Sequence, residues 1–133
     1  MDFIPGIGAT ASGLDAQRTR LEVIAQNLAN IHTTKTEDGG PYQRQVVNFA
    51  EVFDATGNSS VHIESITRDP RSGGARYDPA HPHADEQGLV QMPNVSLSHE
   101  MVDMLSASRA YEANLSAAKT ARSLAQKALE IGR

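Results

Sequence analysis

The chain has 133 residues, of which 39% are hydrophobic and only 5% aromatic, and it contains no tryptophan and no cysteine. This length allows one conventional domain, or two long helices with a small insert, and the lack of cysteine excludes disulfides, thiolate metal sites and cysteine nucleophiles. The net charge is −4, and no face of the predicted elements concentrates lysine and arginine, which argues against a nucleic-acid-binding protein.

The first eleven residues are poor in helix-forming signals. Pro5, Gly6 and Gly8 weaken a helix, so we expect this stretch to fray. It has neither the basic start nor the long apolar run of a signal peptide, and no part of the chain approaches the 18 apolar residues of a membrane span. If the protein acts outside the cytoplasm, another export route must carry it.

Residues 12–30 are predicted to form a helix. Apolar residues recur in this stretch with the heptad spacing of a helix that packs against another helix. They are Leu14, Leu21, Ile24, Leu28 and Ile31, with one polar interruption at Gln17. The helix is expected to end near Asn30, because asparagine tolerates the left-handed conformation and the β-branched threonines that follow do not favour a helix.

The middle of the chain, residues 31–95, has a different character. Strands are predicted over residues 42–53 and 61–66, with a turn at 54–60, and Gly and Pro pairs interrupt the rest. The segment holds nine acidic and five basic residues and therefore carries the whole net charge of −4. It is predicted to be a solvent-facing, turn-rich lobe with one or two hairpins, which is hardly stable alone.

The last third is predicted to form one long helix, from about residue 97 to residue 131. No proline follows Pro93, and no glycine occurs until Gly132, while Ser96 or Ser98 can cap the first turn. Eight of ten positions on one heptad stripe are apolar. The stripe consists of Leu97, Met101, Met104, Ser108, Tyr111, Leu115, Ala118, Arg122, Ala125 and Leu129. At 1.5 Å per residue the helix is roughly 50 Å long, so the shorter N-terminal helix leaves part of this stripe to other partners.

These elements predict a mainly α fold. The long N- and C-terminal helices (residues 1–31 and 96–133) pair as an antiparallel coiled coil, and residues 32–95 form a small lobe of hairpins and loops. An ordinary four-helix bundle is the alternative, but the middle segment does not supply two further helices. Asn27 and Asn114 lie beside the seams. Each either fixes the register of the pair or is simply exposed.

Only one cluster resembles a chemical site. His81 and His83 are two residues apart, with Asp78, Asp85 and Glu86 nearby. On extended backbone this spacing could bind a divalent metal. The same composition is also typical of a surface turn braced by proline. No catalytic motif, such as a nucleophile elbow or a phosphate-binding glycine loop, is present. We therefore expect neither an enzyme nor a cofactor.

Three blocks of sequence resemble the flagellar axial proteins, the family of rod and hook proteins. The first runs from Ser12-Gly13-Leu14 through Ala16-Gln17-Arg18, Asn27-Leu28-Ala29-Asn30 and Thr33-Thr34 to Gly39-Gly40-Pro41-Tyr42. The second runs from His81-Pro82 through Ala84-Asp85 and Gly88 to Pro93-Asn94-Val95. The third runs from Glu100-Met101-Val102-Asp103-Met104 through Ser108-Arg109-Ala110-Tyr111-Glu112-Ala113-Asn114 to Ile131-Gly132-Arg133. The Asn-Leu-Ala-Asn run is shared across the family. The Gly-Gly-Pro-Tyr loop, the Glu-Met-Val-Asp-Met run and the Ile-Gly-Arg ending are similar to a proximal-rod branch.

The resemblance implies a structural subunit of the periplasmic flagellar rod, exported by the flagellar type III apparatus without a cleaved signal peptide. It implies contacts with copies of itself, other rod proteins, basal-body ring and junction proteins, and the export apparatus, but with no nucleic acid and no membrane insertion. The alternative is a soluble helical adaptor or secretion chaperone. The expected assembly interface consists of Leu14, Leu21, Ile24, Asn27, Leu28, Asn30, Met101, Met104, Tyr111, Asn114, Leu115 and Leu129.

Overall fold

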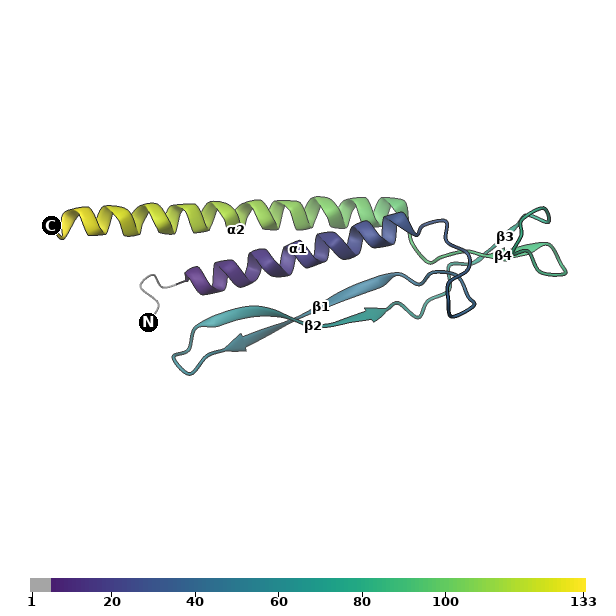
Figure 1. The fold of residues 1–133 in the computed structure, drawn as a ribbon, viewed down its shortest axis with the longest axis horizontal. Helices are drawn as coiled ribbons and strands as arrows, with labels where there is room; N and C mark the ends of the chain where they lie inside the picture. The colour runs from purple at the N-terminus through teal and green to yellow at the C-terminus, as the bar shows by residue number, and fades with distance from the viewer. Residues whose placement is uncertain (1–5) are drawn as a thin grey trace.

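The computed structural model describes residues 6–133 and shows an elongated molecule of two helices and two small antiparallel sheets (Figure 1). In chain order the elements are α1 (Ile7–Ala29), β1 (Gln45–Phe53), β2 (Ser59–Arg68), β3 (Ala75–Tyr77), β4 (Leu89–Gln91) and α2 (Leu97–Ile131). The prediction of two terminal helices flanking a β-containing middle is confirmed. No helix within the described residues has the length and apolar character needed to cross a bilayer.

The 35 residues of α2 form the longest element, and it begins and ends where the sequence predicts. Ser96 has the extended backbone of a cap residue, but its hydroxyl lies 3.2 Å from the Ser98 hydroxyl and reaches no backbone N–H. The prediction of a serine side-chain cap is therefore wrong. Glu100 is the only acidic residue in the first turn of α2.

The first helix begins five residues earlier than predicted. Gly6 caps α1 with a left-handed φ of 91°, and the backbone N–H and hydroxyl of Thr10 both donate to the Gly6 carbonyl, at 3.0 and 2.8 Å. These bonds place residues 7–11 within the helix, and fraying of this turn in the isolated chain stays a prediction. The rest of the stretch that is expected to fray, residues 1–5, lies outside the described residues.

The two helices lie side by side and run in opposite directions (Figure 1). Two contacts set their register. A Cβ on Gly13 would lie 3.1 Å from Nδ2 of Asn114, and Nδ2 of Asn27 lies 3.4 Å from Oε2 of Glu100. The residue numbers add to 127 in both pairs, so Ile7 lies opposite about residue 120. The last turns of α2 therefore extend past the start of α1.

The face of α2 toward α1 is rotated by about one residue from the predicted stripe. Glu100 and Ala107 are fully buried, whereas Met101 is 54% exposed. Half of the ten predicted stripe positions are half-buried and the other half are exposed. The exposed positions are Leu97, Met101, Leu115, Arg122 and Leu129. Close approach of the two helices favours small side chains, because a Cβ on Gly13 would lie closer to the Asn114 side chain than ordinary van der Waals contact.

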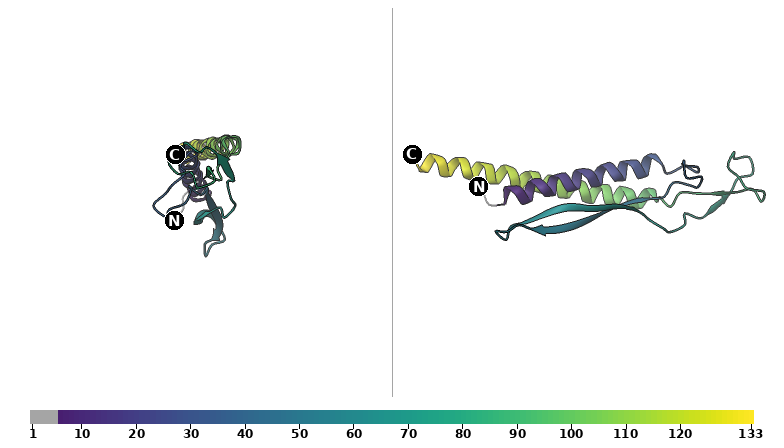
Figure 2. Two further views of the ribbon diagram at one scale, coloured as in Figure 1. Left: turned by 90° about the vertical axis from the view of Figure 1, so that its right-hand side faces the viewer. Right: turned by 60° about the horizontal axis from the view of Figure 1, so that its bottom comes forward.

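β1 and β2 form the predicted hairpin. Their pairing runs from Gln45 opposite Arg68 to Phe53 opposite Ser59, and a register shift between Asn48 and Phe49 leaves Glu64 as an extra residue on β2. Such a bulge increases the local twist of a two-stranded ribbon. α1 lies between α2 and this twisted hairpin, and contacts both (Figures 1 and 2).

The second sheet pairs the three-residue strands β3 and β4 at the far end of the molecule from the C-terminus, and the sequence did not indicate these strands. Within the described residues the buried apolar core is small. It consists of Ala16, Val23, Ile24, Val90 and Ala107, whereas fourteen large hydrophobic residues are exposed. Apolar surface on this scale indicates that the chain has partners.

Candidate functional site

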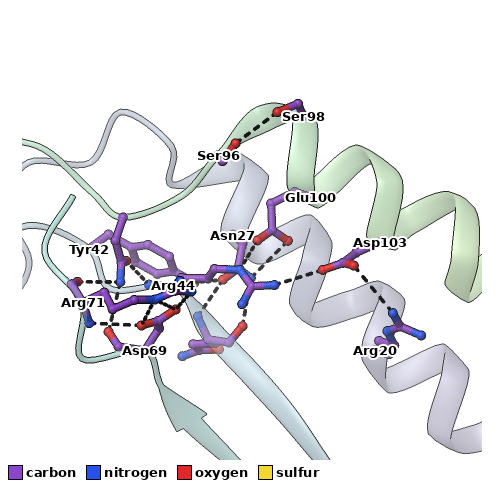
Figure 3. Close-up of polar contacts among 12 residues, drawn as sticks. Arg20, Asn27, Tyr42, Arg44, Asp69, Arg71, Ser96, Ser98, Glu100 and Asp103 are labelled. Carbon is purple, nitrogen blue, oxygen red and sulfur yellow. Dashed lines mark hydrogen bonds and ion pairs between the residues drawn. The ribbon is translucent and has the colours of Figure 1, made fainter. Parts of the chain in front are cut away.

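A polar junction links the C-terminal end of α1, the segment that enters β1 and the first turns of α2 (Figure 3). We define the junction as Asn27, Tyr42, Arg44, Glu100 and Asp103. These residues come from three segments that are remote in the sequence. The junction therefore fixes the two helices and the hairpin relative to one another.

Asn27 is at the centre of the junction and is only 1% exposed. Its Oδ1 accepts hydrogen bonds from the Tyr42 hydroxyl at 2.8 Å and from the Gln45 backbone N–H at 2.9 Å. Its Nδ2 donates to the Gln45 carbonyl at 2.9 Å and to Glu100 at 3.4 Å. A buried amide with both ends bonded specifies one register, which favours the register-fixing interpretation of Asn27 over simple exposure.

Glu100 is fully buried, and the guanidinium of Arg44 neutralises it. Nε of Arg44 donates to Oε1 of Glu100, while Nη2 donates to Oδ2 of Asp103 at 3.0 Å. Nη2 of Arg20 in α1 lies 3.8 Å from the other oxygen of Asp103. One arginine thus bridges two carboxylates that are three residues apart on one face of α2. A buried carboxylate requires such a partner, because removing its hydration is costly.

Tyr42 responds to the same charge. Burial, and then the negative charge of Glu100, raise the pKa of the Tyr42 hydroxyl, while Arg68 opposes them. The phenol therefore stays protonated and remains a hydrogen-bond donor to Asn27. No pattern in the sequence predicts this network. In the sequence, Glu100 is only an acidic residue near the start of a predicted helix, and no spacing pairs it with Arg44, 56 residues away.

Asn94 forms a second set of hydrogen bonds beside the junction. Oδ1 of Asn94 accepts from the Arg44 backbone N–H at 2.6 Å, and its Nδ2 donates to the carbonyls of Asp69 and Arg71 at 3.0 and 2.9 Å. Hydrogen bonds from Arg71 lower the pKa of Asp69 to about 2. Asn94 therefore holds the chain entering α2 against both ends of the hairpin.

The residues predicted to form the assembly interface fall into three groups. Ile24 and Asn27 are buried, and Met101, Leu115 and Leu129 are exposed. The others, which are Leu14, Leu21, Leu28, Asn30, Met104, Tyr111 and Asn114, are half-buried. Contact between these residues and neighbouring subunits stays a prediction.

The histidine cluster folds as a turn. The His83 backbone N–H donates to Nδ1 of His81 at 3.0 Å, and Nδ1 of His83 lies 2.7 Å from the Thr34 hydroxyl. Oδ1 of Asp85 accepts from the backbone N–H groups of Gln87 and Leu89. No group of three or more His, Asp or Glu side chains placed to hold a metal ion occurs within residues 6–133.

Both helical segments match models of known protein families. Residues 8–35 match the family model of the flagella basal body rod protein, and residues 86–131 match that of the flagellar basal body rod FlgEFG protein C-terminal region. The flagellar basal-body rod protein FlgC of Borreliella burgdorferi is 40% identical over 98% of both chains. The FlgC proteins of Bacillus subtilis and Salmonella typhimurium are 37% and 38% identical over 100% and 91% of both chains.

The chain belongs to the FlgC family of flagellar basal-body rod proteins. It is therefore a structural rod protein of the flagellar basal body and works in contact with other rod proteins. The two family matches include Asn27, Glu100 and Asp103 but not Arg44, which comes from the unmatched lobe between them. The junction thus connects this FlgC chain's family-defining helices to its hairpin.

Proposed function

We propose that this chain assembles helically through its terminal helices and transmits torque along the periplasmic part of the rod. The observation that carries the proposal is the exposed apolar surface of α2. Leu97, Met101 and Leu105 follow one another at four-residue steps along this helix and are all more than half exposed. An apolar row of this kind on a long helix is typical of a surface that neighbouring subunits cover.

The polar junction supports the torque-bearing part of the proposal. Buried, fully bonded polar groups hold α1, α2 and the hairpin in one arrangement, so a force on one helix reaches the hairpin without a soft hinge. Close-packed interfaces between subunits are stiff in the same way. This role involves no catalytic step, cofactor or metal.

The small core supports a subunit whose stability depends on assembly. Five buried apolar residues among residues 6–133 are few for a segment of this length, and ordering each backbone residue costs about 1–2 kcal/mol. We infer that the ends of the isolated chain are loosely held, which suits passage through the flagellar export apparatus. Copies of the chain, other rod proteins, and ring and junction proteins of the basal body are the proposed neighbours.

Substitutions on the outer face of α2 test the proposal. Met101→Asp and Leu115→Asp place a charge on exposed positions and are expected to abolish rod assembly and swimming while secretion of the chain continues. Ser106→Asp and Ser116→Asp, also exposed on α2, are matched controls that should swim normally. Normal swimming of Met101→Asp and Leu115→Asp would instead favour the adaptor or chaperone alternative, which predicts a discrete oligomer in the cytoplasm.

A further inference from the structure

The hairpin presents an apolar face that surrounds one carboxylate. Phe49, Glu51 and Phe53 alternate along β1 and share one face, and Val61 pairs directly with Glu51. We name these four residues the hairpin patch. All of them are exposed, Phe53 to 65%, but Phe49 and Val61 only to 37%. Phe49 lines a cavity with Val23 and Ile24 of α1, so the end of the patch at Phe53 is the more accessible one. A carboxylate between two exposed aromatic rings is a distinctive pattern for a partner to recognise.

The C-terminal part of α2 presents the complementary pattern. Leu124, Lys127 and Ile131 lie on one stripe, because positions i, i+3 and i+7 share a helix face. We name them the C-terminal stripe. Leu124 and Ile131 are 62% and 85% exposed, and the stripe points away from the side of α2 on which Ala107 is buried. It also lies in the turns of α2 that extend past α1.

The two surfaces match in both length and charge. Phe49 and Phe53 are about 13 Å apart at 3.3 Å per strand residue, and Leu124 and Ile131 are about 10.5 Å apart at 1.5 Å per helix residue. Each pair has one charge between its apolar ends, negative at Glu51 and positive at Lys127. Residues 45–68 hold three acidic and one basic residue, whereas residues 115–133 hold four basic and one acidic.

The two surfaces do not meet within one chain. α1 separates α2 from the hairpin, and α2 packs against neither β1 nor β2 (Figures 1 and 2). We propose that the hairpin patch of one copy packs on the C-terminal stripe of a second copy of this chain. The inference rests on the proposed function, that copies of the chain assemble with one another. A contact between two different patches adds copies head to tail, and it gives an open helical array when the rotation between successive copies does not close a ring.

Cysteine cross-linking tests the contact, and the chain has no cysteine of its own. Cells that produce Glu51→Cys/Lys127→Cys as their only copy should yield a ladder of disulfide-linked chains in isolated basal bodies. Separate Glu51→Cys and Lys127→Cys chains produced together should yield dimers only, and each alone should yield none. Val52→Cys with Lys127→Cys is the matched control, because Val52 lies on the opposite face of β1. Equal cross-linking in this control, dimers from one variant alone, or links only to a different rod protein would overturn the proposal.

Charge exchange gives an independent test. Glu51→Lys and Lys127→Glu should each reduce incorporation of the chain into basal bodies about tenfold, since like charges then face each other across the contact. The double variant should recover most of the loss. If the unaltered chain assembles and the double variant recovers nothing, this inference fails while the proposed function stands. If the unaltered chain never assembles with copies of itself, both fail.

Discussion

The side chain of Glu100, in the first turn of α2, is fully buried and accepts a hydrogen bond from Nε of Arg44, which precedes β1. This one contact joins a helix matched by a family model to the lobe that lies between the two family matches. The carboxylate is too deeply buried to find water if the guanidinium is removed. The ion pair therefore fixes the position of α2 relative to the hairpin more than it adds to the net free energy of folding.

Removing the Arg44 guanidinium should lower the free energy of unfolding far more than removing an exposed guanidinium does. Arg44→Met leaves Glu100 as an uncompensated buried charge and should lower the free energy of unfolding by about 3–5 kcal/mol in urea denaturation. Arg68→Met is the control, because its ion pair with Asp38 is 62% and 67% exposed, and such pairs contribute at most about 1 kcal/mol. Equal losses in the two variants would mean that water reaches Glu100.

The extent of α2 could be predicted from the sequence, but the face that it buries could not. Proline and glycine mark the two ends of the helix, and their effects on backbone geometry are local. Heptad counting instead favours the largest apolar residues, such as Met101 and Leu115. The structure buries Glu100 and Ala107, because a close helix pair needs small or specifically bonded side chains that a hydrophobicity pattern does not reveal.

Ala107 gives a direct test of this rotated face. Ala107→Leu introduces three extra carbons at a position with no exposed surface and should destabilise the helix pair by about 1–3 kcal/mol. Ala113→Leu, at an exposed position on the same helix, should change stability by less than about 0.5 kcal/mol. Thermal unfolding followed by circular dichroism compares the two, and an unchanged midpoint for Ala107→Leu would place the helix interface elsewhere.

The polar junction was beyond sequence reasoning for a different reason. Asn27 could be singled out as a polar residue beside a seam, but its partners come from segments whose folding is set by the whole molecule. Arg44 lies in a stretch that reads as the start of a strand, and Glu100 in one that reads as a helix start. Only the antiparallel arrangement of α1 and α2 brings the two side chains together.

The hydrogen bonds that the Asp54 carboxylate accepts at the tip of the hairpin should weaken in acid. The Asp54 carboxylate accepts hydrogen bonds from the Thr56 hydroxyl at 2.6 Å and from the Asn58 backbone N–H at 2.9 Å, and these bonds lower its pKa from 3.8 to about 2. A lowered pKa in the folded state contributes stability above the unfolded value, and this contribution is lost as the pH falls through about 2.

Replacement of Thr56 by valine removes the strongest of these bonds. Thr56→Val should therefore raise the pKa of Asp54 toward 3.8, as measured by an NMR titration of its carboxyl carbon. Amide exchange at Asn58 should become faster in the same variant between pH 4 and pH 2. A Thr120→Val variant, altered at an exposed position on α2, is the control and should leave the Asp54 titration unchanged. A midpoint near 3.8 in the unaltered chain would show that the tip is not held by this carboxylate.

Two glycines of the lobe should respond oppositely to alanine. A Cβ on Gly73 would lie 2.2 Å from the Met92 carbonyl oxygen and 2.4 Å from the Pro93 carbonyl carbon, so the backbone leading into α2 would have to move. Gly73→Ala should lower the free energy of unfolding by about 1–3 kcal/mol. It should also speed amide exchange at Met92, whose N–H donates to the Gly74 carbonyl at 3.0 Å.

Gly40 is the matched control for this substitution. It has a negative φ and no atom within 4 Å of an added Cβ. Gly40→Ala should be neutral or should stabilise the chain by about 0.4–1 kcal/mol, because alanine restricts the unfolded state. If Gly73→Ala proved as harmless as Gly40→Ala, the segment before α2 would not pack against residue 73. The lobe would then be free to move relative to the helices, and the junction could not carry force to it.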